Sequence, residues 1–219
     1  QEIAFHREYR SVIADDGKDR ILVVSSGIGG PSLAIAIEEL ARLGIQTFIR
    51  VGTSGAIQDF IRVGDLIISE GAVRMDGTSE HYAPMSFPAC ADFSVVTALN
   101  QAAKQLGYNY HSGITCTSAT FYPGQERYDT FTHYVVRSLQ GSLEEWKKLG
   151  ILNYEMEIAT LYTLARVFGL KAGAVCGIIV NRNQKEDVDL KTLQEVEERM
   201  SRVAVQAAKI LLSQKDTSN

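Results

Sequence analysis

The sequence of 219 residues predicts a single α/β domain over residues 1–219, with a central mixed, largely parallel sheet flanked by helices. Three observations carry this prediction. Short β-branched runs end in glycine-rich turns, and amphipathic segments with helical spacing lie between them. Hydrophobic residues make up 45% and charged residues 22% of the chain, as in ordinary globular proteins. No linker or internal repeat divides it.

The first three elements form the clearest pattern. Residues 21–24 (ILVV) are a short apolar run that ends in a Ser-Ser-Gly turn, which is typical of a buried strand. A helix is expected from Pro31, which suits a first helical position, to Gly44. Residues 47–51 (TFIRV) predict the next strand. A strand, a helix and a strand in this order indicate a βαβ unit with parallel pairing.

The same alternation continues to the end of the chain. The later elements that we expect are a strand at 65–69, a long loop at 75–92, a helix from the cap residue Asp92 to Gly107, a strand at 113–116, a helix at 158–168, a buried strand at 171–180 and an amphipathic helix at 190–212.

Charge and cysteine content exclude several classes of protein. Lys and Arg number 22 against 26 Asp and Glu, which gives a net charge of −4 and argues against a nucleic-acid partner. No apolar stretch is long enough to span a bilayer, so no membrane partner is expected. Cys90, Cys116 and Cys176 lack the spacing of a zinc site or a disulfide framework. They predict reduced thiols in a cytoplasmic protein.

Residues 26–32 (SGIGGPS) are the first candidate for binding chemistry. Glycines between a strand and a helix allow backbone N–H groups to face an anion at the helix N-terminus. The segment matches neither the nucleotide triphosphate loop nor a complete dinucleotide fingerprint. A tight turn whose glycines only permit close packing is the alternative.

Residues 50–55 (RVGTSG) are a stronger candidate. They place Arg50 and hydroxyl groups at the end of a predicted strand, and the carboxyl ends of strands are where α/β sheets bind ligands. A guanidinium suits an oxyanion because its planar fork makes two parallel hydrogen bonds. A surface arginine in a salt bridge is the alternative.

Two later segments complete the set. Residues 121–128 (FYPGQERY) combine an aromatic face with an amide and a guanidinium, which suits a flat heterocycle with carbonyl edges, although a polar Pro-Gly surface turn is also compatible. Residues 153–157 (NYEME) carry two carboxylates just before a predicted helix. These carboxylates either accept hydrogen bonds from the paired hydroxyls of a sugar or are ordinary charges at a helix start.

Other catalytic arrangements are not indicated. The four histidines show no metal-ligand spacing, and residues 52–55 are one residue short of the nucleophile elbow of serine hydrolases. Metal catalysis and serine hydrolysis are therefore disfavoured.

Taken in order, the four segments resemble the nucleoside phosphorylase family, and within it the branch that cleaves uridine. The resemblance runs from residues 6–9 (HREY) to the last helix, which is nearly the whole chain. Residues 121–129 are similar to the uracil-reading segment of that branch, and residues 153–157 to its ribose-binding segment. In residues 178–182 (IIVNR), Asn181-Arg182 stands where purine-cleaving relatives typically place a Ser-Asp pair.

The resemblance implies phosphorolysis of uridine, and of deoxyuridine, to uracil and the sugar 1-phosphate in pyrimidine nucleoside salvage. It assigns catalysis to Arg127, Gln125 and Arg50, phosphate binding to Arg7, Arg50 and Thr53, ribose binding to Thr53, Glu155, Met156 and Glu157, and base binding to Phe121, Gln125, Arg127, Ile179, Val180 and Arg182.

The resemblance also implies an assembly. It predicts a hexamer built as a trimer of dimers, in which Arg7 reaches the phosphate of a neighbouring subunit. Phosphate is the co-substrate, no organic cofactor is expected, and a monovalent cation such as K⁺ would lie between subunits on Glu8, Ile28 and Ser32. Family members begin with a strand and a Gly-Asp-Pro-x-Arg phosphate loop. We expect this segment to be missing from the sequence, which starts at Gln1.

Two alternative functions remain open on the sequence. One is a purine-directed or hydrolytic relative in the same family, and the other is a nucleoside-binding protein without turnover. The need for phosphate, the choice between uridine and inosine, and the appearance of free base distinguish these functions from phosphorolysis of uridine.

Overall fold

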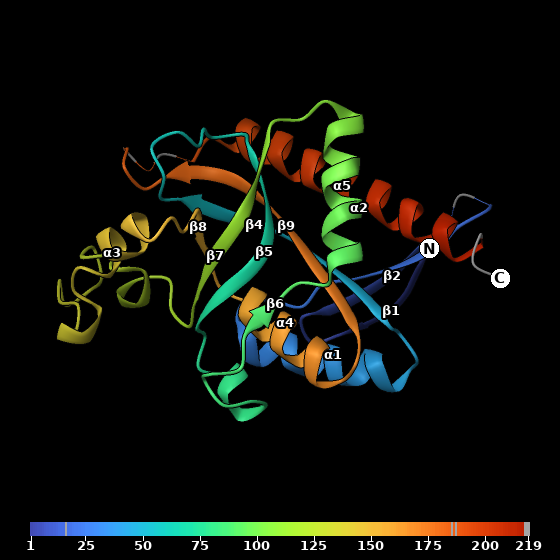
Figure 1. Cartoon of the computed structure of the whole chain (residues 1–219), viewed down its shortest axis with the longest axis horizontal. Helices are drawn as coiled ribbons and strands as arrows, with labels where there is room; N and C mark the ends of the chain where they lie inside the picture. The colour runs from blue at the N-terminus through green and yellow to red at the C-terminus, as the bar shows by residue number, and fades with distance from the viewer. Residues whose placement is uncertain (16, 185, 187, 217–219) are drawn as a thin grey trace.

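Six strands form a mixed sheet in the computed structural model, which describes residues 1–15, 17–184, 186 and 188–216 (Figure 1). Their order is β6-β5-β7-β8-β4-β9, and β9 also pairs with β5, so the sheet closes into a barrel-like arrangement. The pairs β4–β9, β5–β7 and β7–β8 are parallel, and the others are antiparallel. The strands are β4 (Thr47–Ala56), β5 (Leu66–Met75), β6 (Ala89–Cys90), β7 (Tyr110–Ser118), β8 (Asn153–Glu155) and β9 (Lys171–Asn181).

Helices cover the sheet on two sides. Figure 1 shows α2 (Phe93–Leu106) and α5 (Leu190–Asp216) on one side, and α1 (Gly30–Arg42) and α4 (Ile158–Val167) on the other. The segment with α3 (Ser142–Lys148) extends away from the barrel at the left of that view. Three short 3₁₀ helices complete the elements, namely η1 (Ser79–His81), η2 (Pro123–Gln125) and η3 (Arg137–Leu139). The α/β class and the flanking helices are confirmed.

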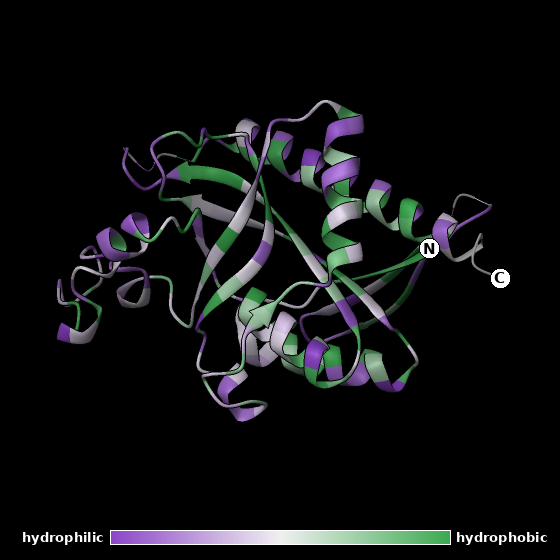
Figure 2. Cartoon of the chain, viewed as in Figure 1, coloured by the Kyte–Doolittle hydropathy of each residue, from purple (hydrophilic) through white to green (hydrophobic). Residues whose placement is uncertain are grey.

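The core follows from the alternation of side chains along the strands. In β5, Leu66 and Ile68 pack with α2 and α5, whereas Ile67 between them packs with α4. All three are fully buried, because both faces of the strand are covered. Figure 2 shows apolar residues on the inner strands and polar residues on the outward sides of the helices.

The predicted βαβ unit is wrong in its first strand. β3 (Arg20–Val24) does not pair with β4; it joins β1 (Glu2–His6) and β2 (Tyr9–Asp15) in a separate three-stranded antiparallel sheet. The run is also not buried, since Val23 is 51% exposed. The reason is local: a hairpin brings β2 against β3, and its hydrogen bonds satisfy the strand that a parallel neighbour was expected to pair.

The other predicted elements are found, but the strands predicted at 47–51 and 65–69 continue to Ala56 and Met75. Asp92 caps α2 by accepting a hydrogen bond from the Ser94 N–H at 3.0 Å, and Gly107 ends the helix in the left-handed conformation at φ 71°. The expected loop at 75–92 also contains η1 and β6. Among the described residues, no helix carries an apolar stretch long enough to cross a membrane.

Candidate active site

A cavity of about 860 Å³ lies where β4 and β9 end, and all four sequence segments contribute to it. β4 and β9 are parallel, so their last residues reach the same edge of the sheet. The described residues that line it and that the sequence predicted are Ile28, Arg50, Thr53, Phe121, Gln125, Arg127, Glu155, Met156, Glu157, Ile179, Val180 and Arg182. Segments separated by more than a hundred residues in sequence therefore form one surface.

Arg50 is a buried cation of this cavity. It lies within β4 and not at the end of the strand as the sequence predicted, because the strand continues to Ala56. Its side chain is 12% exposed, and its Nη2 lies 3.1 Å from Oε2 of Glu155 and in contact with Oε2 of Glu157. Its Nη1 donates to the Sγ of Cys176 at 3.3 Å. Burial opposes the charged guanidinium, but the two carboxylates and the thiol outweigh it, and the pKa of Arg50 is raised.

Gly52 makes room for this guanidinium. Residues 50 and 52 lie on the same face of β4, and a Cβ on Gly52 would approach Nη1 of Arg50 to 2.7 Å. The Arg-x-Gly spacing therefore has a steric reason that is separate from any ligand.

Glu155 is a buried carboxylate that links Arg50 to the neighbouring elements of the site. Its side chain is fully buried and accepts hydrogen bonds from the Thr117 hydroxyl and from the N–H groups of Glu157 and Ile158. It thereby caps the start of α4. Burial raises the pKa of Glu155, and Arg50 opposes this shift. With its oxygens committed to protein groups, Glu155 holds Arg50 in place.

Glu157 is the carboxylate that borders the open cavity. One oxygen accepts the backbone N–H of Gly29, and the other meets Arg50. Glu157 therefore connects the glycine loop before α1 with the cation on β4. Thr53 and Met156 line the cavity beside it.

The opposite end of the cavity carries aromatic and guanidinium groups. The Cζ of Arg127 lies 4.2 Å from the centroid of the Phe121 ring, a cation–π contact. Phe121 in turn meets Tyr122 edge to face, with centroids 5.2 Å apart. Gln125 is 4% exposed and its side chain faces the same cavity.

Two arginines converge on one carboxylate at this end. Arg127 pairs with Glu186 through Nη1, and Arg182 pairs with the same carboxylate through Nε at 2.8 Å. Arg182 also donates to the backbone carbonyl of Gln125 at 2.9 Å. Burial and the charge of Arg127 lower the pKa of Arg182, and Glu186 opposes this. Both guanidiniums are deeply buried, so Glu186 compensates a local excess of positive charge.

Three predicted residues lie outside the cavity. Arg7 stands at the tip of the β1–β2 hairpin with φ 55°, and Glu8 follows it. The Ser32 hydroxyl donates to Oε1 of Glu8 at 3.0 Å and also contacts the carbonyl of Ser26. Glu8 and Ser32 thus present neighbouring oxygens near Ile28, which fits the chemistry of a monovalent cation. The cation itself stays a prediction.

Several lining residues had no role predicted from the sequence. Tyr154, Glu186 and Val188 line the cavity but were given no role, and Cys176 beneath Arg50 was treated only as a thiol. Burial raises the pKa of Cys176 to about 12, so it is a neutral donor or acceptor here. Residues 171–180 are almost uniformly apolar, so no pattern in the sequence indicated that Cys176 lies against Arg50. Glu186 lies after the last strand, where no periodic pattern operates.

Comparisons with known proteins agree with this geometry. Residues 1–213 match the family model described as the phosphorylase superfamily. The chain is 53% identical over 212 residues to uridine phosphorylase of Salmonella typhimurium, covering 96% of this chain and 83% of the relative. It is 50% identical over 186 residues to uridine phosphorylase of Thermococcus kodakarensis (85% and 67% covered). Guanosine phosphorylase of Halorubrum lacusprofundi is 39% identical over 187 residues (84% and 71% covered). The chain belongs to the phosphorylase superfamily.

Proposed function

We propose that this enzyme cleaves uridine, and also deoxyuridine, by phosphorolysis to uracil and the sugar 1-phosphate, a reaction of pyrimidine nucleoside salvage. The observation that carries the proposal is the division of one cavity into two ends. A buried arginine with a hydroxyl and a carboxylate stands at one end, and an aromatic ring with an amide and two guanidiniums at the other. The high identity to uridine phosphorylases supports the substrate.

The two ends suit the two halves of the reaction. We call the end with Arg50, Thr53 and Glu157 the phosphate end, and the end with Phe121, Gln125, Arg127 and Arg182 the base end. A phosphate oxygen forms a bond to C1′ of the ribose while the bond from C1′ to N1 of uracil breaks, and the electron pair leaves with the base. Arg50 and Thr53 would hold phosphate, and Glu157 and Met156 the ribose. Holding both reactants in one cavity replaces a collision by a step within the complex.

Uracil would leave as an anion that later takes a proton from solvent or from the phosphate. Arg127 and Gln125 would bind its carbonyl edge, Arg182 would act near O4, Phe121 would stack on the ring, and Ile179 and Val180 would line its pocket. Preorganised donors stabilise negative charge where it develops, so no strong general acid is required.

Asn181 and Arg182 bear on the choice between pyrimidine and purine. Asn181 is 2% exposed, and its side-chain amide donates to the carbonyls of Gln58 and Ile61. It therefore fixes the loop after β4, and the next residue, Arg182, stands where the Asp of purine-cleaving relatives would protonate the base. This arrangement favours a pyrimidine nucleoside.

A homo-oligomer is the second part of the proposal, as a hexamer assembled from dimers, with K⁺ bound near Glu8 between subunits. Large apolar side chains are exposed on the small sheet and near the site, including Phe5 at 68% and Ile28 at 79%. Exposed apolar groups of this kind are typical of protein contact surfaces. Arg7 would extend into a neighbour from the tip of the β1–β2 hairpin.

Light scattering of the purified protein tests the assembly. We expect a particle of six times the 24.1 kDa chain mass. A single species at the chain mass, at protein concentrations used for activity assays, would contradict the oligomer.

Uracil release tests the reaction. We expect uracil to form from uridine only when phosphate is present, in step with ribose 1-phosphate, and inosine to react far more slowly. Uracil formed without phosphate would indicate a hydrolase, and preference for inosine a purine enzyme. Uridine binding by calorimetry with no product in phosphate buffer would indicate a binding protein.

Replacing Arg127 tests the base end. In Arg127→Ala we expect kcat/KM for uridine to fall by about a hundredfold or more, because a charged donor to the leaving base is lost. The KM for phosphate should change little. Arg137→Ala, at an exposed arginine in η3, serves as the control. An Arg127→Ala enzyme as active as the parent would refute the assignment of this segment to the base.

Glu186→Gln tests the role of the carboxylate between the two arginines. Because Glu186 competes with uracil for Arg127 and Arg182, its neutral variant should bind uracil more tightly, by about fivefold to tenfold in the inhibition constant. Glu197→Gln removes an exposed charge from α5 and is the matched control. Weaker uracil binding in Glu186→Gln would show instead that Glu186 holds the arginines in place.

A further inference from the structure

Glu126 stands between the two base-end residues Gln125 and Arg127 but differs from both in conformation. Its backbone is left-handed, with φ 53° and ψ 47°, which costs free energy for a residue with a Cβ. The turn around it is closed by the Arg127 N–H donating to the Tyr122 carbonyl at 2.8 Å. Such a conformation persists only where the surroundings hold it.

The side chain of Glu126 stabilises this backbone conformation by hydrogen bonds. Oε1 accepts the N–H of Gly141 at 2.5 Å and the Tyr128 hydroxyl at 3.2 Å, and Oε2 accepts the N–H of Leu143 at 2.7 Å. The two N–H groups are at the start of α3, where the helix leaves N–H groups without partners inside the helix. A carboxylate that accepts from two of them makes charge-assisted hydrogen bonds and is favoured by the helix dipole.

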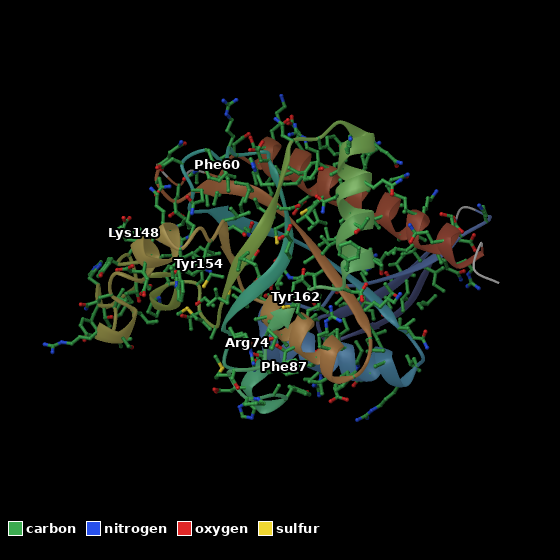
Figure 3. The ribbon with its side chains drawn as sticks, viewed as in Figure 1. Phe60, Arg74, Phe87, Lys148, Tyr154 and Tyr162 are labelled. Carbon is green, nitrogen blue, oxygen red and sulfur yellow. The ribbon has the colours of Figure 1, made fainter. Side chains whose placement is uncertain are left out.

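The helix that Glu126 grips is itself fixed to the sheet. Leu143 and Trp146 of α3 pack against Tyr154 of β8 and Ile57, which follows β4. The side-chain amide of Gln58 donates to the carbonyls of Lys147 and Ile151, at 2.9 and 2.7 Å. Figure 3 shows Tyr154 between the barrel and the segment that carries Lys148. The position of α3 is therefore set by β8 and by the residues that directly follow β4, the strand that carries Arg50.

We propose that Glu126 is a positioning residue for base recognition. By gripping α3 it fixes the left-handed turn that points Gln125 and Arg127 into the cavity, at a set distance from the phosphate end. This inference rests on the proposed function for its kinetic readout. No contact of Glu126 with substrate is needed.

Three substitutions at position 126 separate the effect of the side-chain hydrogen bonds from the effect of the backbone conformation. Glu126→Ala removes the hydrogen bonds from Gly141, Leu143 and Tyr128, and we expect the KM for uridine to rise about tenfold while the KM for phosphate stays within about twofold. Glu126→Gln keeps the shape and one acceptor, so it should restore most of the loss. Glu126→Gly relieves the backbone cost of the left-handed conformation but has no side chain, and it should be no better than alanine.

Two results would overturn the proposal. Glu126→Ala with an unchanged KM for uridine, or with equal rises for uridine and phosphate, would show that Glu126 does not position the base end. Recovery in Glu126→Gly would show that the backbone conformation alone matters. Glu145→Ala, at an exposed glutamate of the same helix, is the control and should match the parent.

A second measurement is independent of turnover. Hydrogen exchange at the amides of Gly141 and Leu143 should accelerate at least tenfold in Glu126→Ala and much less in Glu126→Gln. If the parent protein releases no uracil from uridine, the proposed function fails. Hydrogen exchange still tests whether Glu126 holds the start of α3. Unchanged exchange at both amides would show that it does not, whatever the activity.

Discussion

The guanidinium of Arg50 is a positive charge buried beside β4, and its two carboxylate partners organise the site around it. Glu155 ties it to the start of α4, and Glu157 ties it to the loop before α1. An unpaired buried charge would cost several kcal/mol, so these segments cannot separate without a large loss of stability. The position of the cavity is a consequence of this pairing.

The base end is also held by buried ion pairs, but the ratio of guanidiniums to carboxylates is reversed. There two guanidiniums share one carboxylate, whereas at the phosphate end one guanidinium shares two. The formal charges therefore do not cancel: the two guanidiniums leave an excess of positive charge at the base end, and the two carboxylates leave an excess of negative charge around Arg50. Glu126 links the base end to α3 by hydrogen bonds, and α3 packs against the residues that follow β4, the strand that carries Arg50. Charge fixes each end, and packing fixes the distance between them.

The sequence predicted the elements whose signals are local. Asp92 and Gly107 bounded α2 correctly, and the apolar runs located β5 and β9. Strand pairing was harder to predict. Residues 21–24 have the sequence of a buried parallel strand, but they pair with β2 in an antiparallel hairpin. The partner of a strand depends on which other segments compete for its backbone hydrogen bonds. The segments that line the cavity were predicted, but Glu186 and Glu126 were not assigned roles. Both act through contacts with distant groups that no spacing in the chain reveals.

A double-mutant cycle on Arg50 and Glu155 tests most directly the claim that this buried pair holds the site together. The free energies of unfolding of Arg50→Met, Glu155→Gln and the double variant are compared with the parent at one protein concentration. The account predicts that each single change costs about 3 kcal/mol and that the double variant costs clearly less than their sum, with a coupling of about 2 kcal/mol. Additive losses would contradict it, because Arg50 and Glu155 would then contribute to stability independently.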